Sequence, residues 1–308
     1  MAENYDEIIL KLNAEYVGIT NSAEYRVGKY FRKAISIFKH EPIKAFRSSI
    51  KEYIIHTKIK KYKKFSKRFK PMDRIQPQEK IAVYTIIFGN YDSLLDPIVV
   101  DSMCDYYVIT DQNCTSKIWK KIDVDISSFL GANAANNILK NRYGKLNPET
   151  IFPDYKYTMY IDGNLQLYGK PSDFICYINE TTGLALFNHA TRICIYDEGE
   201  VCKIVKRSVP RKVNQQLDKY RSEGMPKNFG MCECNVILRK NTSESNAIMH
   251  NWWSEFLNSN TLRDQLAFPY VLWRIGYTIK DIGCLGDDIN CSAYFRRITH
   301  IKSGELKQ

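Results

Sequence analysis

The sequence has 308 residues, of which 44% are hydrophobic and 13% aromatic, so the chain can bury a sizeable core and is not expected to be disordered. Its net charge of +11 predicts an acidic partner, either nucleic acid, an anionic membrane surface or a phosphorylated substrate. No apolar run approaches the roughly 20 residues that span a bilayer, and the acidic start of the chain does not resemble a signal peptide, which predicts a cytoplasmic protein with reduced cysteines.

Residues 1–78 are expected to form a basic, amphipathic helical region that is distinct from the rest of the chain. Apolar residues recur at helical spacing over 31–38 and 43–54. The run IKKYKKFSKRFK (59–70) interleaves bases with aromatic residues, and two interpretations remain open. It is either a solvated helix face or linker, or a basic surface that lies against anionic lipid. A nucleic-acid-binding arm is less favoured, because the remaining chain has no recognisable nucleic-acid-binding motif.

Residues 79–308 are expected to form an α/β domain with a mostly parallel central sheet flanked by helices. Segments rich in β-branched and aromatic residues predict strands at 81–89, 105–110, 155–161, 183–189 and 231–239. Helical patterns lie between and after them, at 131–144, 200–207, 245–257 and 262–276. Strands that alternate with helices are typical of this fold class.

Cys232 and Cys234 are the only closely spaced pair among the nine cysteines. Their one-residue gap does not match a CxxC zinc site, and both thiols face the same side of the expected strand, so core packing is favoured over metal binding. Glu233 faces the opposite side. It is either a carboxylate of a binding site or a solvent-facing strand residue.

Polar side chains follow the expected strands at the points where the strands end. In α/β sheets, ligands bind outside the carboxyl ends of the strands. The residues placed there are Asn90, Asp92, Asp111, Asp162, Asn164, His189 and Arg192. A set rich in carboxylates and amides suits a nucleotide diphosphate that is held through Mn²⁺ or Mg²⁺, since these ions prefer oxygen ligands.

Asp162-Gly163-Asn164 directly follows the strand YKYTMYI. Asp162 supplies a carboxylate and Asn164 an amide oxygen for a metal ion, and Gly163 lets the backbone approach the phosphates. Such an ion neutralises a departing diphosphate. The alternative is a tight turn, for which these dipeptides are common. The acids at neighbouring strand ends favour the donor-binding interpretation.

Several other enzyme classes lack their usual signatures in this sequence. There is no GxGxxG, GxxxxGK[ST] or GxSxG segment, which removes the support for dinucleotide-binding oxidoreductases, P-loop enzymes and serine hydrolases of the α/β type. The five histidines form no HExxH or paired ligand spacing, which disfavours a zinc hydrolase.

Several blocks resemble, in one order over about residues 81–285, a glycosyltransferase-like family long catalogued as a domain of unknown function. They are VYTIIFGNYD (83–92), YVITD (107–111), YTMYIDGNLQL (157–167), RICIYDEGEVC (192–202), YRSEGMP (220–226), CNVILRKN (234–241), NWWSEF (251–256) and RDQLAFPYVLW (263–273). The family occurs in bacterial polysaccharide loci and among plant mucilage and pectin proteins. The resemblance implies a GT-A-like fold with an Asp-x-Asp-type motif at Asp162. Asn164 departs from that motif, which makes the metal less certain than the glycosyl transfer.

Further residues are assigned roles on this basis. Asp264 is expected to contact or deprotonate the acceptor hydroxyl, unless it caps its helix. Asn90, Asp92 and Asp111 are expected to line the nucleoside pocket. The other candidates are Arg142 and Lys145 for the diphosphate, His189 and Arg192 for the diphosphate or the sugar, and His300 as a metal or phosphate ligand.

The predicted activity is transfer of a sugar from a nucleotide diphosphate sugar to a growing cell-surface glycan, such as a capsule or O-antigen. The acceptor is expected to be lipid-linked at the inner face of the membrane, which gives the basic start of the chain an anionic surface to bind. Two alternatives stay open. One is an inactive glycan- or nucleotide-binding scaffold, supported by Asn164, and the other is a sugar or polyol phosphotransferase that uses the same acids.

Overall fold

The computed structural model describes residues 5–29, 32, 53–64, 67–75 and 77–300. Near the start of the chain it contains α1 (Tyr5–Asn21) and a helical segment over 53–60. Apart from residues 32, 53 and 54, the helices predicted over 31–38 and 43–54 lie outside the described residues.

The centre of the molecule is a seven-stranded sheet with the order β3-β2-β1-β4-β7-β6-β8. β7 runs antiparallel to both of its neighbours, and the other pairings are parallel. This confirms the prediction of an α/β fold with a mostly parallel sheet. The strands are β1 (Ile81–Ile87), β2 (Cys104–Thr110), β3 (Lys120–Lys121), β4 (Tyr157–Ile161), β6 (Leu184–Asn188), β7 (Cys232–Lys240) and β8 (Gly283–Cys284).

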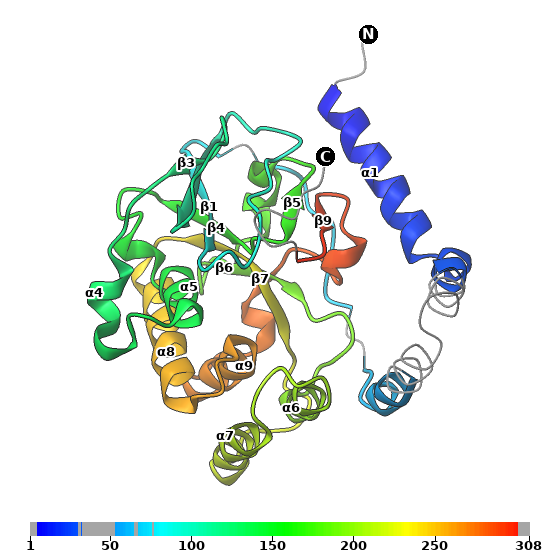
Figure 1. Cartoon of the computed structure of the whole chain (residues 1–308), viewed down its shortest axis with the longest axis vertical. Helices are drawn as coiled ribbons and strands as arrows, with labels where there is room; N and C mark the ends of the chain where they lie inside the picture. Colours follow the sequence, from blue (N-terminus) through cyan, green and yellow to red (C-terminus); the bar gives the residue numbers. More distant parts are fainter. Residues whose placement is uncertain (1–4, 30–31, 33–52, 65–66, 76, 301–308) are drawn as a thin grey trace.

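The two faces of this sheet are covered differently. Tyr84 and Ile86 of β1 pack into a core with the helices, whereas Ile81 and Val83 pack into a second core below a small β5–β9 sheet. Figure 1 shows α5, α8 and α9 on one side of the central strands and β9 on the other. Because both faces are covered, all of β1 is buried, which is why it reads as a continuous apolar run.

The remaining elements are short helices and the two strands of the small sheet. The α-helices are α4 (Ile126–Leu130), α5 (Asn137–Leu146), α6 (Ile195–Ile204), α7 (Pro210–Ser222), α8 (Ser243–Ser259) and α9 (Asp264–Arg274). The 3₁₀ turns are η1 (Gly131–Asn133), η2 (Pro148–Thr150), η3 (Pro171–Tyr177), η4 (Ile279–Asp281) and η5 (Ile289–Cys291). The small sheet pairs β5 (Leu165–Leu167) with β9 (Phe295–Arg297).

The strand directions bring five strand ends to one edge of the central sheet. The carboxyl ends of β1, β2 and β4 meet there because these strands are parallel. β7 reverses direction, so its amino end lies at the same edge, with Val236 opposite Ile161. Asn188 at the carboxyl end of β6 then pairs with Cys232. We call this edge the rim.

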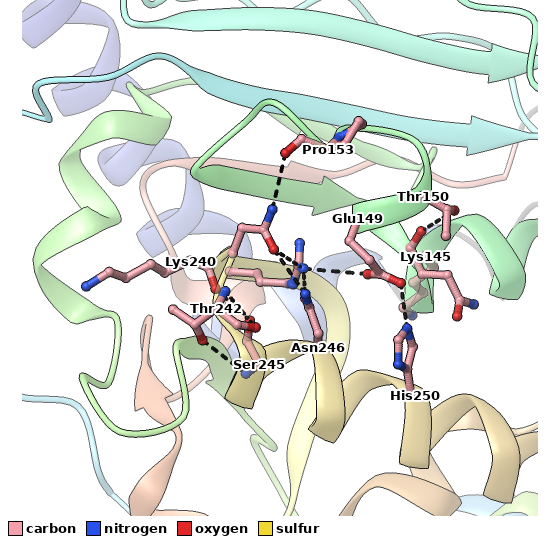
Figure 2. Close-up of polar contacts among 12 residues, drawn as sticks. Lys145, Glu149, Thr150, Pro153, Lys240, Thr242, Ser245, Asn246 and His250 are labelled. Atoms are coloured by element: carbon pink, nitrogen blue, oxygen red, sulfur yellow. Dashed lines mark hydrogen bonds and ion pairs between the residues drawn. The ribbon is translucent and has the colours of Figure 1, made fainter.

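The opposite edge of the sheet holds a charged group that we call the base cluster: buried Arg239, half-buried Glu149 and exposed His250. Arg239 lies on β7 opposite Thr158 and is 1% exposed. Glu149 Oε2 is 3.5 Å from Arg239 Nη2, and its Oε1 is 2.7 Å from His250 Nε2. Figure 2 shows Glu149 and His250 joined across the gap between η2 and α8. The base cluster therefore ties a central strand to two surface elements.

Two N-terminal segments contact the α/β domain. α1 lies near β9 (Figure 1), where Asn13 donates to the Ala293 carbonyl at 2.6 Å and accepts from Arg296. Further along the chain, Arg68 donates through its backbone N–H to Asp287 at 2.7 Å and through its guanidinium to the Ile282 carbonyl. Residues 67–75 lie outside helices and strands, so this part of the basic run is a linker held on the domain. None of the helices in the described ranges is both long and apolar enough to cross a bilayer.

Candidate active site

Asp162 directly follows β4 at the rim, and its backbone N–H donates to the Asn235 carbonyl of β7 at 2.9 Å. The Asp162 carbonyl accepts from the N–H of Leu165 at 2.9 Å, so the segment is indeed a tight turn. The Tyr160 hydroxyl donates to Asp162 Oδ1 at 2.8 Å. A Cβ at Gly163 would lie 3.0 Å from the Ile87 side chain, which explains the glycine. The segment is therefore a tight turn, and it lies at the rim.

Asp92 brings a distant part of the chain to the same place. Its buried carboxylate is 2.8 Å from His300 Nδ1, and the ring of His300 is 4.9 Å from that of Tyr91. Burial raises the pKa of Asp92, the charge of Asp162 raises it further, and His300 opposes both. His300, 208 positions beyond Asp92, thus lies beside the loop that follows β1. The Asp162 turn is close enough for its charge to act on Asp92.

Asp111 links the ends of β1 and β2. Its two carboxylate oxygens accept from the N–H of Gly89 at 3.0 and 3.1 Å. Gly89 has a φ of 68°, and a Cβ there would lie 2.3 Å from the Asn137 side chain, so only glycine fits. Asn90 and Asp111 are exposed at the rim, as predicted. Their contact with a nucleoside stays a prediction.

Asp264, Arg142 and Lys145 form a second charged group at the rim, which we call the rim cluster. Asp264 begins α9, while the two bases come from the last turns of α5. Asp264 Oδ2 is 2.6 Å from Lys145 Nζ and 3.1 Å from Arg142 Nε. The indole N–H of buried Trp252 donates to the Asp264 carbonyl at 2.8 Å and fixes the start of the helix.

The charges of the rim cluster set its protonation. Burial by itself raises the pKa of Asp264, but the charges of Arg142 and Lys145 outweigh it and hold that pKa well below the usual range. A carboxylate with such a low pKa is a poor proton acceptor. Asp264 is thus better placed as the counterion that positions the two bases. Arg142 keeps 19% of its side chain exposed, and its environment includes the charge of Asp162.

His189 and Arg192 lie at the end of β6, separated from Asp162 by β7. The Arg192 guanidinium donates to the buried carboxylate of Glu198. Burial raises the pKa of Glu198, but its contacts with His189 and Arg192 outweigh this and lower that pKa to about 2. His189 Nε2 is 3.6 Å from Glu198 and 3.7 Å from Glu233. We call these four residues the β6-end cluster.

Several partners in these groups were not predicted. Glu198 follows an apolar run, and nothing in its spacing pairs it with His189 or Arg192. Tyr160 and Trp252 are buried aromatic residues, and each also holds a rim residue through one polar atom. A buried tyrosine or tryptophan needs such a partner, which is the one signal that points to them.

The predicted metal ligands give a partial set. Among the described residues no three His, Cys, Asp or Glu side chains gather as a metal site. The Tyr160 hydroxyl donates to Oδ1 of Asp162, and His300 uses Nδ1 on Asp92. Asn164 is held by its carbonyl, which accepts from Ile298 at 2.8 Å. One or two side chains suffice for an ion that also binds phosphate, so these residues fit that kind of site and no all-protein cage.

Comparison with known proteins gives one family and several relatives. A family model described as the TOD1/MUCI70 glycosyltransferase-like domain matches residues 56–282. The probable hexosyltransferase MUCI70 of Arabidopsis thaliana is 24% identical over 216 residues, which cover 62% of this chain and 37% of that protein. The chain therefore spans well under half the length of this curated relative.

Solved structures are similar at lower identity. Mouse xyloside xylosyltransferase 1 matches with a TM-score of 0.41 and 10% identity over 72% of this chain and 96% of that one. The galactosyltransferase LgtC, solved with donor and acceptor sugar analogues, matches with a TM-score of 0.38 and 11% identity over 62% and 70% of the two chains.

Proposed function

The chain belongs to the family of TOD1/MUCI70 glycosyltransferase-like domains, and from that premise we propose that it is a GT-A-like enzyme that transfers a hexose or related sugar from a nucleotide diphosphate sugar to a glycan. The observation that carries the proposal is the rim cluster. There two buried or half-buried bases share a single carboxylate beside the Asp162 turn.

The surplus positive charge of the rim cluster suits a diphosphate. Lys145 is 2% exposed and bound to Asp264, whereas Arg142 remains partly open to solvent. An anion that reaches Arg142 would meet a guanidinium already desolvated and oriented by Asp264, and charge-assisted hydrogen bonds are the stronger class. In this arrangement Asp264 acts on the donor through the two bases and is not itself the base of the reaction.

Asp162, with Asn164 and His300, would hold a Mn²⁺ or Mg²⁺ ion together with the phosphate oxygens of the donor. Such an ion would supply charge neutralisation for the departing diphosphate. Asp92 orients the His300 ring through Nδ1 and leaves Nε2 for the ligand, which is the usual arrangement around a metal-binding histidine. Asn90 and Asp111 would line the nucleoside pocket beside them.

The transfer exchanges one bond for another at the anomeric carbon. The acceptor hydroxyl oxygen forms a bond with that carbon, and the bond from the carbon to the diphosphate oxygen breaks. The diphosphate leaves with the electron pair and is stabilised by Arg142 and Lys145. The hydroxyl proton passes to a carboxylate or to the departing phosphate.

The acceptor is proposed to be a growing cell-surface glycan, such as a capsule or O-antigen, linked to lipid at the inner face of the membrane. Support comes from the exposed lysines that gather on and after the helical segment 53–60, near exposed Tyr53 and Ile54: Lys58, Lys60, Lys61, Lys63, Lys64, Lys67 and Lys70. Basic residues next to exposed apolar ones favour anionic lipid surfaces. The protein would then be cytoplasmic and peripheral to the membrane.

The test is donor hydrolysis and transfer by the full chain with UDP-, GDP- and CMP-sugars, Mn²⁺ and a lipid-linked glycan extract, with and without anionic vesicles. We expect turnover of one donor class, and we expect Asp162→Ala to lose more than about 100-fold of it, as for other groups that stabilise a leaving charge. Asp154→Ala, an exposed acid before the start of β4, is the control. If the protein neither binds nor turns over any of the donors, the proposal is wrong. If Asp162→Ala keeps its activity, the assignment of the site is wrong.

A further inference from the structure

Glu233 is the carboxylate of the β6-end cluster that stays open to solvent. Its side chain is 23% exposed, whereas that of Glu198 is 1% exposed. It sits at the amino end of β7, one strand away from Asp162, so it faces the rim beside the proposed donor site. The transfer chemistry described above does not use it.

The arginines in and around the cluster contact groups other than Glu233. Arg192 donates to Glu198, and Arg207 Nη1 lies 4.0 Å from the same residue. The guanidinium of Arg68 contacts the Cys232 thiol and donates to the backbone carbonyl of Ile282, which lies between η4 and β8. In the described part of the chain, the ion pairs of Glu233 include only His189. Glu233 therefore makes no direct ion pair with an arginine or lysine in this described part of the chain.

His189 is oriented by the backbone so that it faces Glu233 without saturating it. Its Nδ1 accepts from the N–H groups of Thr191 and Arg192, both at 3.2 Å, which places the ring proton on Nε2. Nε2 is 3.7 Å from Glu233 Oε1, too long for a direct hydrogen bond. Nε2 also lies 3.3 Å from Nη2 of Arg192 and 3.6 Å from Glu198, so His189 contacts these two residues while Glu233 Oε1 accepts no direct hydrogen bond from it.

A second observation at the same strand end points to a ligand. The Oδ1 atom of Asn235 is buried and has no hydrogen-bond partner among the described residues. Its backbone carbonyl accepts from Asp162, so this side chain belongs to the strand segment between the donor turn and Glu233. A buried polar atom without a partner is costly, and a polar ligand at the rim would remove that cost.

We propose that Glu233 and His189, with Asn235 beside them, form the subsite for the acceptor, and that this subsite binds the hydroxyl groups of a neutral sugar. A carboxylate and an imidazole N–H can receive and donate hydrogen bonds to neighbouring sugar hydroxyls. Because the exposed carboxylate of Glu233 has no direct ion pair with an arginine or lysine among the described residues, it disfavours uronic acids and phosphorylated sugars, so the acceptor residue bound there is uncharged. The inference rests on the proposed glycosyl transfer, because it names the acceptor of that reaction.

The experiment measures binding of methyl hexosides and of methyl glucuronoside to the full chain by ligand-observed NMR titration, with the affinity for nucleotide diphosphates measured in parallel. The wild type should bind a neutral hexoside at least about 10-fold more tightly than the glucuronoside, the size expected for hydrogen bonds to a charged group. Glu233→Gln should lose that preference and leave nucleotide affinity unchanged within about twofold. Glu180→Gln, at a side chain 88% exposed, is the control.

Retained preference in Glu233→Gln, or no preference in the wild type, overturns the subsite. Glu233→Asp serves as the second variant, and it should keep the preference with weaker binding. Unchanged nucleotide affinity shows that a variant is folded. Failure of the proposed function has a different signature, because a wild type that binds neutral hexosides but neither binds nor hydrolyses any nucleotide sugar keeps the sugar subsite and loses the transferase.

Discussion

The rim cluster and the base cluster are both buried ion groups built around an arginine, yet their charge balance differs. At the rim, Arg142 and Lys145 share the single carboxylate of Asp264. At the base, Arg239 faces Glu149 and is also bound by the side chains of Asn241 and Asn246 (Figure 2). One group has a positive charge to spare and the other is close to neutral.

This difference separates binding from stability. A surplus base at the exposed end of the sheet can attract an anion, and burial makes that attraction stronger than it is in water. A balanced pair inside the opposite end attracts nothing further. Its value lies in connecting β7 to η2 and α8, and breaking it leaves a buried charge without a partner. Replacing the arginine by methionine should therefore weaken ligand binding in the rim cluster and lower the stability of the fold in the base cluster.

Arg142→Met should weaken nucleotide diphosphate binding by about 10-fold or more, because it removes a charge-assisted contact worth roughly 1.5–3 kcal/mol. Its cost in unfolding free energy should stay near about 1 kcal/mol, since Lys145 still pairs with Asp264. Isothermal titration with the preferred nucleotide and chemical denaturation measure the two effects. Unchanged affinity would show that the rim cluster does not bind the diphosphate.

Arg239→Met should cost about 3 kcal/mol of unfolding free energy, the lower end for a broken buried pair. We take the lower end because the substitution also removes two buried guanidinium nitrogens, Nε and Nη1, that have no hydrogen-bond partner among the described residues. Nucleotide affinity should not change. His250→Ala is the matched control, and it should cost below about 1 kcal/mol because that side chain is 55% exposed. An equal loss of unfolding free energy in Arg239→Met and His250→Ala would contradict the stabilising role of the buried Arg239–Glu149 pair.

A further expected effect is the loss of stability in acid. The pKa of Asp264 is depressed in the folded protein, and that of Glu198 is lowered to about 2. A depressed carboxyl pKa stabilises the fold above its unfolded value of about 4, and that stability is lost as pH falls toward the folded pKa. Below about pH 4 we expect each group to contribute up to about 1.4 kcal/mol per pH unit of decline. Denaturation curves from pH 2.5 to 7 measure this.

Asp264→Asn should remove its share of the acid slope, whereas Asp154→Asn, at an exposed residue, should leave the slope as in the wild type. A slope that persists in Asp264→Asn would mean that the rim cluster does not hold Asp264 ionised. The pH dependence then tests the rim cluster without any ligand, which makes it independent of the affinity measurement.

Much of the rim was predictable because strand ends are visible in sequence. The apolar runs that became β1, β2, β4 and β6 end at polar residues, and parallel strands bring such ends together. This placed Asp92, Asp111 and Asp162 at one edge. The family resemblance added the order of the blocks, and the family match confirms it.

Which charged side chains contact one another could not be predicted from the strand ends. Asp264 looked like a base because acids often begin helices near acceptors, but its neighbours in space are two cations from α5, 119 positions earlier in the case of Lys145. Arg239 lies near the end of β7, and nothing in the neighbouring sequence marks its contact with Glu149. The protonation of a buried carboxylate depends on such neighbours more than on its own segment.

What the sequence determined by itself is the fold class and the edge at which the chemistry lies, because hydrophobic periodicity and strand ends are local properties. Only the tertiary structure decided which charges are in surplus. Asp92 meets His300, Arg142 and Lys145 meet Asp264, and His189 meets Glu233 through contacts between separate elements. Electrostatic attraction depends on distance and burial, and both are fixed only when the elements pack.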